Sequence, residues 1–295
     1  MTMKPDVEIH RRFLFAIAYR MLGSGADAED VVQDAYIRYL AVPETEVESP
    51  KALLATIVTR LCLNLLGSAR RRRETYVGTW LPEPVWSEAD ALDASSPLDR
   101  WQSVSVAFLV LLEQLSPLER AVFVLHELFD HDYAEIGRIV ARTPAACRQL
   151  GSRAREHLER QRPRFPPTPE AHRALVARFA RSVGSGDLRG LIELLAQDVV
   201  LDADSGGRFP GAVLAPLRGR EAVAGFVAST PRLPAGPFDA AIGDVNGEPA
   251  LVLRGRTDGA IRVVITLEID GGVVRAIRAM ANPDKLRWLN ASRDR

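Results

Sequence analysis

The chain has 295 residues, of which 47% are hydrophobic and 26% are charged, and its formal net charge is zero. This length allows two or three compact units, each with its own core, and the composition is ordinary for a globular protein. A net charge of zero argues against a simple nucleic-acid coat protein.

The charges are strongly segregated along the chain. Acids dominate residues 27–48, where Arg38 is the basic residue, whereas residues 51–73 contain no acid and end in four consecutive arginines. Arginine dominates again in residues 142–164. Such alternating blocks can meet a basic protein surface at one place and phosphate at another.

The cysteines and the N-terminal residues indicate a compartment. Cys62 and Cys147 lie far apart in predicted helices and offer neither a disulfide framework nor a metal-binding spacing. Charged residues from Glu8 to Arg12 interrupt any signal peptide, and no segment approaches the length of a membrane span. We therefore expect a soluble cytoplasmic protein that has no membrane contact, no metal and no cofactor.

The first block of the chain is predicted to be a small helical bundle. Apolar residues recur every four positions from Phe13 to Met21, a second helix begins near Ala26, and a third begins at Lys51. Periodicity then fails between Glu74 and Leu98, where prolines and acids alternate with aromatic residues such as Trp80 and Trp86. We favour the interpretation that this segment packs in extended form on a neighbouring domain. The alternative is that it binds in a groove of a partner protein.

The second helical block, from Trp101 to about Gln161, contains a predicted helix-turn-helix. Ser116, Pro117 and Glu119 start a helix that is expected to run to Phe129. In residues 132–155 an amphipathic helix is followed by Thr143 and Pro144, an N-cap and a first-turn proline. Exposed arginine and glutamine side chains on the second helix are of the kind that read base edges, although a plain amphipathic helix pair shows the same apolar spacing.

After the proline-rich residues 162–169 the pattern changes to helices followed by strands. Helices are expected over residues 171–185 and 188–195, and strand patterns cover residues 199–202, 250–254, 261–269 and 273–279. This order predicts an α+β domain with a curved antiparallel sheet. The expected architecture is multidomain: two all-α helical domains, the second with the helix-turn-helix, precede the α+β domain.

Three stretches in order resemble the conserved domains of an extracytoplasmic-function (group IV) bacterial sigma factor. They read GSGADAEDVVQDAYIRYL, SPKALLATIVTRLCLNLLGSARRRR and SPLERAVFVLHELFDHDYAEIGRIVARTPAACRQLGSRARE. The resemblance implies binding of core RNA polymerase, through its beta-prime clamp helices and beta flap, and recognition of promoter DNA by a protein that is monomeric when free. One departure is Leu53-Leu54, where the family usually has a tryptophan.

The resemblance also implies roles for individual residues. Those expected to bind core polymerase are Asp30, Gln33 and Asp34. Those expected at the minus-10 element are Thr59, Arg60, Asn64, Arg70, Arg71, Arg72 and Arg73, the four arginines neutralising phosphate. Those expected at the minus-35 element are Arg148, Gln149, Ser152, Arg153 and Arg155, the last as a phosphate contact.

Further motifs resemble the sigma-factor subgroup that carries a C-terminal SnoaL-like extension, a cone-shaped α+β domain. The linker motif YVGTWLPEP covers residues 76–84, and the tail contains a DGG turn, with Val273 in place of the motif lysine, followed by NPDKL. The resemblance implies self-regulation through intramolecular contacts. The regulatory residues it implies are Asp270, Gly271, Gly272, Asn282, Pro283, Asp284 and Lys285.

These patterns predict the following domain organisation. Residues 1–75 form a sigma region-2 domain, residues 76–104 a linker, residues 105–162 a region-4 domain, residues 163–170 a hinge and residues 171–295 the SnoaL-like domain.

Other functions remain possible on the sequence alone. One is a ligand-sensing helix-turn-helix regulator that acts without polymerase, although such a protein has no use for the acidic helix Ala26–Leu40. Another is an enzyme in the C-terminal domain, for which the clustered acids are Asp198, Asp202 and Asp204. We interpret these acids as a solvated loop and expect no catalysis, because fold alone implies no activity. A ligand-sensing pocket remains open.

Overall fold

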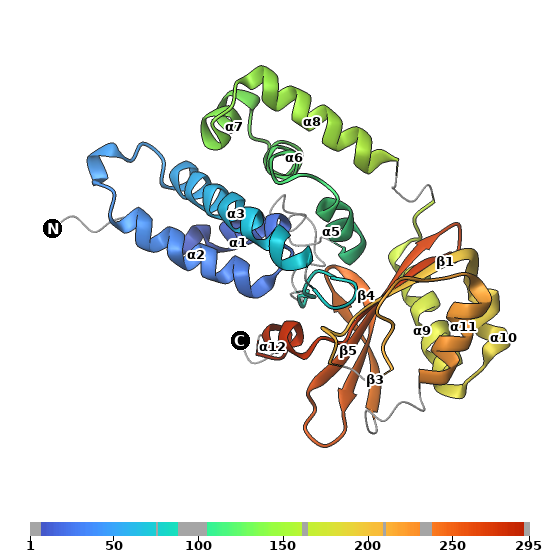
Figure 1. The fold of residues 1–295 in the computed structure, drawn as a ribbon. Helices are drawn as coiled ribbons and strands as arrows, with labels where there is room; N and C mark the ends of the chain where they lie inside the picture. The colour runs from blue at the N-terminus through green and yellow to red at the C-terminus, as the bar shows by residue number, and fades with distance from the viewer. Residues whose placement is uncertain are drawn as a thin grey trace. The chain divides into compact units, whose positions relative to one another are not determined.

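The computed structural model describes residues 7–74, 76–87, 105–160, 165–208, 211–230 and 238–291, with the side chains of residues 68–74 outside the description. The described chain divides into two compact units (Figure 1). One contains residues 7–74 and 108–160, and the other contains residues 76–87, 105–107 and 165–291. Below, residues 7–74 are called the N-terminal bundle, residues 105–160 the helix-turn-helix half and residues 165–291 the C-terminal domain.

The N-terminal bundle consists of packed helices. Its elements are η1 (Val7–His10), α1 (Arg11–Leu22), α2 (Gly25–Leu40), η2 (Glu44–Glu46) and α3 (Pro50–Glu74). Gly23 ends α1 in the left-handed conformation, with φ of 67°, and Ser24 then caps α2 by accepting from the Asp27 N–H at 3.1 Å. The core contains Leu14, Ile17, Val32, Leu54 and Val58.

Helix α3 corrects one expectation about membranes. Its stretch Pro50–Gly67 is 18 residues long and apolar enough to cross a membrane by length and composition. A single such helix is weak evidence of a span, because the core helix of a globular domain shares these properties. Here Leu54, Val58 and Cys62 are fully buried in the bundle.

The helix-turn-helix half has α5 (Val106–Glu113), α6 (Pro117–Phe123), the π-helix η4 (Val124–Leu128), α7 (Tyr133–Val140) and α8 (Pro144–Glu159). The helix expected from Glu119 to Phe129 is therefore present as far as Leu128, but its last turn is a π-helix. The π-helix widens the last turn, and Asp130 then adopts a positive φ of 56°, so that the chain turns into α7. Apolar spacing over so short a stretch predicts helix but does not distinguish a single π-turn from an α-turn.

Within the described part of the chain, the C-terminal domain packs its first three helices on one face of a mixed sheet and its last helix on the other (Figure 1). Its elements are α9 (Pro169–Ser185), α10 (Leu188–Leu194), β1 (Leu195–Asp204), β2 (Leu217–Arg218), α11 (Arg220–Ser229), β3 (Phe238–Val245), β4 (Glu248–Gly255), β5 (Ile261–Asp270), β6 (Val273–Met280) and α12 (Pro283–Ala291). In the described residues the strand order is β2-β1-β6-β5-β4-β3. The expected antiparallel pairing is confirmed for four pairs of described strands and is wrong for one, because β1 and β6 pair in parallel.

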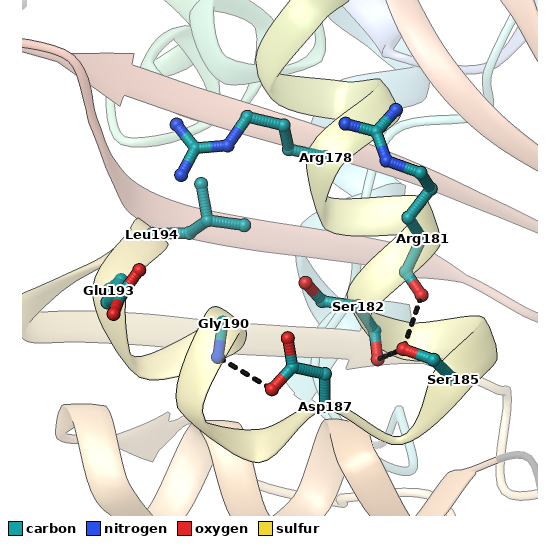
Figure 2. A pocket seen from close by; sticks show the side chains of 8 residues that line it. All are labelled: Arg178, Arg181, Ser182, Ser185, Asp187, Gly190, Glu193 and Leu194. Carbon is teal, nitrogen blue, oxygen red and sulfur yellow. Dashed lines mark hydrogen bonds between the residues drawn. The ribbon is translucent and has the colours of Figure 1, made fainter.

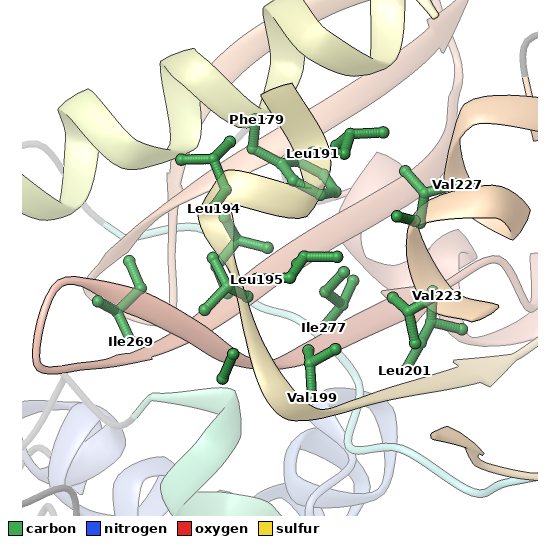
Figure 3. Close-up of a cluster of buried hydrophobic side chains, with 14 of the residues drawn as sticks. Phe179, Leu191, Leu194, Leu195, Val199, Leu201, Val223, Val227, Ile269 and Ile277 are labelled. Atoms are coloured by element: carbon green, nitrogen blue, oxygen red, sulfur yellow. The ribbon is translucent and has the colours of Figure 1, made fainter. Parts of the chain in front are cut away.

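Aliphatic side chains fill the space between the sheet and helices α9, α10 and α11. Phe179 of α9, Leu191 of α10 and Val223 of α11 meet Leu201 and Ile277 from the sheet (Figure 3). Because side chains alternate along β1, Asp202 and Asp204 lie on the opposite face from Leu201. That opposite face carries the charged groups described below.

Candidate functional site

The acidic helix α2 presents a mixed acidic and apolar surface. Asp30 and Gln33 are exposed, and Asp34 is half-exposed and pairs with Arg38 at 3.0 Å. One turn further, Ile37 has 69% of its surface exposed. Leu40, at the end of the same helix, is 59% exposed, so α2 carries exposed apolar as well as acidic side chains.

The residues expected at the minus-10 element differ in accessibility. Asn64 and Arg60 are exposed on α3, but Thr59 is fully buried and its Oγ1 has no hydrogen-bond partner among the described residues. The assignment of Thr59 to a DNA-facing position is therefore corrected for this conformation. The physical reason is helical phase, since Thr59 lies next to Val58 and Cys62 on the buried side of α3. The side chains of Arg70 to Arg73 lie outside the described residues.

The helix-turn-helix places polar side chains along the exposed side of α8. Arg148, Gln149, Ser152 and Arg153 are all exposed, while Cys147 is buried against the rest of the half. Thr143 caps α8 by accepting from the Ala146 N–H at 3.2 Å, and Pro144 occupies its first turn. One face of α8 is therefore polar and exposed.

Arg155 is engaged within the helix-turn-helix half. Its guanidinium forms an ion pair with Glu127 of the π-helix, and this partner raises the pKa of Arg155. Its side chain is 45% exposed. Glu127 therefore competes with any phosphate for this guanidinium.

A glycine missed at the sequence level shapes the turn of the helix-turn-helix. A Cβ placed on Gly137 would lie 2.6 Å from the backbone oxygen of Arg142, which leads into α8. We expect Gly137→Ala to destabilise the fold by about 1–3 kcal/mol, because backbone must move to relieve the contact. Urea unfolding of the full chain measures this loss. The matched change Gly67→Ala, at a helical glycine with no atom near its Cβ, is expected to be neutral or slightly stabilising.

In the C-terminal domain a buried polar cluster surrounds Asp204 at the end of β1; the cluster comprises Tyr76, Leu81, Asp204, Asn282 and Lys285. Asp204 has no exposed surface. Its carboxylate accepts from the Tyr76 hydroxyl at 2.5 Å, the Leu81 N–H at 2.9 Å and the Lys285 ammonium at 2.6 Å. The interpretation of Asp202 and Asp204 as a solvated loop is therefore wrong, because both belong to the strand and both carboxylates are buried and paired.

The other members of the cluster join two sequence motifs. Asn282 donates to the Tyr76 hydroxyl at 2.6 Å, and Lys285 donates to the Leu81 carbonyl at 2.6 Å. The ammonium of Lys285 also lies 4.1 Å from the centre of the Trp80 ring. Burial, together with the Asp204 carboxylate, raises the pKa of Tyr76, which therefore stays protonated as a donor. The YVGTWLPEP segment is thus bound to the NPDKL segment through Asp204.

The same linker continues along the C-terminal domain as an added strand-like segment. Val85 exchanges hydrogen bonds with Asn246, at 3.1 Å and 2.9 Å, and Trp86 pairs with Val245 in an isolated β-bridge. The indole of Trp86 donates to the Leu289 carbonyl of α12 at 3.2 Å. The aromatic residues of the linker therefore serve for packing on its neighbour.

The DGG turn binds Phe165, which follows the helix-turn-helix half in the chain. We call residues 76–87, before that half, the first connector, and the segment at Phe165, after it, the second connector. The Asp270 carboxylate accepts from the Phe165 N–H at 2.7 Å, and the Gly271 N–H donates to the Phe165 carbonyl at 3.1 Å. Gly271 and Gly272 both have positive φ, 61° and 79°, which suits glycine in a hairpin turn. Pro283 starts α12, and Asp284 pairs with Arg208 at 2.7 Å.

Further charges lie on the same face of the sheet as Asp204. Arg278 pairs with Asp202 and lies 3.5 Å from Glu268. Burial, with the Glu268 carboxylate adding to it, raises the pKa of Glu248 to about 7. Burial also raises the pKa of Glu268, and Asp270 contributes. The face therefore carries more buried carboxylate than cation.

A polar groove lies on the helical side of the C-terminal domain, between α9 and α10. It has a volume of about 260 Å³, and Figure 2 shows Arg178 and Arg181 beside Ser182 and Asp187. These side chains are exposed or half-exposed on the surface. The enzyme hypothesis requires an acid or histidine facing an apolar pocket, and neither this groove nor the filled interior of Figure 3 supplies that arrangement among the described residues.

Sequence reasoning alone did not identify the partners that complete the cluster. Tyr76 lies more than a hundred residues before Asp204 and Asn282, the two cluster members to which its hydroxyl is hydrogen-bonded. The available signal was compositional: aromatic residues in a linker and an aspartate at a strand end. Neither signal says which segments meet.

Comparison with known families identifies both halves of the first unit. The model for sigma-70 region 2 matches residues 7–72, and that for sigma-70 region 4 matches residues 105–158. These matches overlap the N-terminal bundle and the helix-turn-helix half.

Relatives extend the similarity over the whole length. The ECF RNA polymerase sigma factor SigJ of Mycobacterium tuberculosis is 40% identical over 95% of this chain and 92% of its own length. The probable ECF RNA polymerase sigma factor SigI of the same organism is 32% identical over 96% and 94%. The crystal structure of SigJ matches with a TM-score of 0.74 and 34% identity, covering 95% of this chain and 96% of that one.

Proposed function

Because the chain belongs to the extracytoplasmic-function RNA polymerase sigma factors, in the subgroup with a SnoaL-like C-terminal domain, we propose that this domain regulates initiation by holding both connectors of the helix-turn-helix half. One observation carries the proposal. The Asp204 cluster binds Tyr76 and Leu81, Asn246 binds Val85, and the DGG turn binds Phe165. These segments precede and follow the helix-turn-helix half in the chain.

The physical consequence is a limit on movement. A sigma factor reads two promoter elements with two domains, so its domains must reach a fixed separation on DNA. Connector residues that are bound to the C-terminal domain cannot extend, so they do not help the two DNA-binding domains to move apart. We propose that release of either connector raises initiation, and that Asp270, Gly271, Gly272 and the NPDKL segment act through these fastenings.

The remaining roles are proposed for residues that lie on the surface. Asp30, Gln33 and Asp34 face the polymerase beta-prime clamp helices, with Ile37 on the same surface, and the helix-turn-helix half meets the beta flap. On DNA, Arg60, Asn64 and Arg70 to Arg73 serve the minus-10 element, while Arg148, Gln149, Ser152, Arg153 and Arg155 serve the minus-35 element. The protein acts without catalysis, as a monomer when free, in the cytoplasm.

Reconstituted transcription with core polymerase tests the proposal. The double variant Asp30→Lys/Asp34→Lys is expected to lose initiation by tenfold or more, because two attractive contacts become repulsive. The control Glu44→Lys/Glu46→Lys makes the same charge change at exposed residues beside α2. Equal activity of all three proteins would remove the polymerase-binding assignment.

The same transcription assay tests the second connector with the variant Asp270→Ala. We expect several-fold more transcript, because Phe165 loses its side-chain fastening. The control Asp258→Ala removes an exposed turn aspartate that pairs with Arg262 at 2.6 Å. An unchanged or lower transcript yield for Asp270→Ala contradicts the proposed direction of control.

The variant Arg148→Ala tests whether this arginine recognises a base of the minus-35 element. We expect a loss of about 1–3 kcal/mol in promoter binding and a relaxed preference at one minus-35 base, if this arginine forks onto a guanine. Arg71→Ala should instead weaken binding to all sequences and reduce the salt dependence by about one charge. Titrations of holoenzyme with base-substituted promoters at several salt concentrations separate the two, and equal, sequence-independent losses would refute the division.

A further inference from the structure

Two arginines cross between the N-terminal bundle and the helix-turn-helix half in opposite directions. Arg60 of α3 donates from Nε to the Ile139 carbonyl and from Nη2 to the Arg138 carbonyl, both at 3.0 Å. These carbonyls lie in the last turn of α7, which ends at Val140. Carbonyls in a last turn have no intrahelical partner and carry partial negative charge, so they favour a cation.

Arg120 of α6 makes the reverse contact. It donates from Nη1 to the Met21 carbonyl at 2.7 Å, in the last turn of α1, and to the Glu113 carboxylate at 2.6 Å. Arg120 is 3% exposed. Burial lowers its pKa to about 10, so it remains charged at neutral pH. Each half thus supplies an arginine to the end of a helix in the other half.

An aromatic contact lies at the same interface. Phe129, which follows the π-helix, meets Phe13 of α1 edge to face with the ring centres 5.3 Å apart, and the Arg20 guanidinium lies 5.6 Å from the Phe129 ring. Both phenylalanines are buried. The arginine contacts therefore flank a dry, packed interface rather than a chance surface approach.

We propose that Arg60 and Arg120 form a reciprocal arginine pair that holds the free protein closed, and that this pair must open before the minus-10 helix can bind DNA. The proposal rests on the role assigned above to Arg60. Arg60 donates to α7 through Nε and Nη2. This pair of donors is the one that binds a phosphate or a base in bidentate geometry. Promoter binding and separation of the two halves are therefore coupled through one side chain.

Distance measurement in the full-length free protein tests the pair without polymerase. Spin labels are placed at Glu46→Cys and Glu159→Cys, both exposed, while native Cys62 and Cys147 are fully buried. We expect one narrow distance distribution for the parent protein. Arg60→Gln should raise the ratio of open to closed molecules at least tenfold, which corresponds to about 1.4 kcal/mol.

The matched control is Arg160→Gln, at the exposed C-cap arginine of α8, whose partner is Glu156 of that helix. It removes the same charge and should leave the distance distribution unchanged. A distribution for Arg60→Gln that coincides with the parent would overturn the proposal. Because Arg60 is exposed at the surface of α3, this variant keeps the bundle core, and circular dichroism checks that it does.

A second variant separates closure from DNA contact. Arg120→Gln breaks the contact with Met21 but touches no residue assigned to DNA. It should lengthen the label distance and speed open-complex formation by holoenzyme several-fold, whereas Arg60→Gln should lengthen the distance yet bind the minus-10 element less well. Identical behaviour of the two variants on DNA would show that Arg60 has no DNA role, which is a failure of the proposed function and leaves the closure measurement standing.

Discussion

Replacement of Asp204 by alanine is expected to lower the unfolding free energy of the C-terminal domain by about 3–5 kcal/mol, because it leaves a buried lysine without its partner. Lys285 is 8% exposed, and its ammonium lies 2.6 Å from the Asp204 carboxylate. The Leu81 N–H and the Tyr76 hydroxyl lose their acceptor as well. Denaturant unfolding, monitored by tryptophan fluorescence, measures the loss and also reports on Trp80 in the linker.

Two comparisons make this prediction specific. Asp198→Ala removes another carboxylate from the same strand. Asp198 pairs with Arg275 at 2.8 Å on the surface, so its loss should change the unfolding free energy little. The double variant Asp204→Leu/Lys285→Met removes both charges and should recover much of the stability, since well-packed apolar groups often replace a buried ion pair without loss. A single variant as stable as the parent would show that the cluster does not hold the linker.

Loss of stability as the pH rises through about 7 is the second large effect, and it originates at Glu248. Its pKa is raised from an ordinary 4.5 to about 7, first by burial and then by Glu268. A raised carboxyl pKa means that the folded state favours the protonated form. The contribution is fully present below about pH 4.5 and is lost as the pH rises through about 7, by at most about 3 kcal/mol.

Glu248→Gln tests the assignment because the amide cannot ionise. Urea unfolding at pH 5 and pH 8 should show a smaller difference between the two pH values for this variant than for the parent. Glu221→Gln, an exposed acid in the first turn of α11, serves as the control and should keep the parent's pH dependence. Parallel pH profiles for Glu248→Gln and the parent would assign the effect to other groups, such as Glu268.

Much of the fold followed from local patterns. The limits of α1, α9 and β5 agree closely with the periodicity of their residues, because one buried face repeats at a fixed spacing along each. Short elements were missed: β3 is rich in alanine and glycine, and α11 follows a long irregular stretch. The parallel pairing of β1 with β6 joins strands that are distant in sequence, so no turn residue announces it.

The candidate sites also include some features that the sequence predicted and others that it did not. The exposed faces of α2 and α8 could be predicted, because a helical residue's side is set by its position relative to the apolar stripe. The same logic missed Thr59, whose polar side chain lies inside the stripe. Asp204 was misassigned because whether an acid is solvated depends on what covers it, and its cover comes from Tyr76, Leu81 and Lys285.

The sequence by itself determined the family, the order of the domains and the helices that carry the DNA- and polymerase-binding candidates, because these depend on local spacing and residue type. Only the tertiary structure decided that both connectors are bound to the C-terminal domain and that Arg60 is directed at α7. The reason is that such contacts join backbone carbonyls and buried charges from distant segments. Their energies depend on burial and distance, which no stretch of sequence specifies alone.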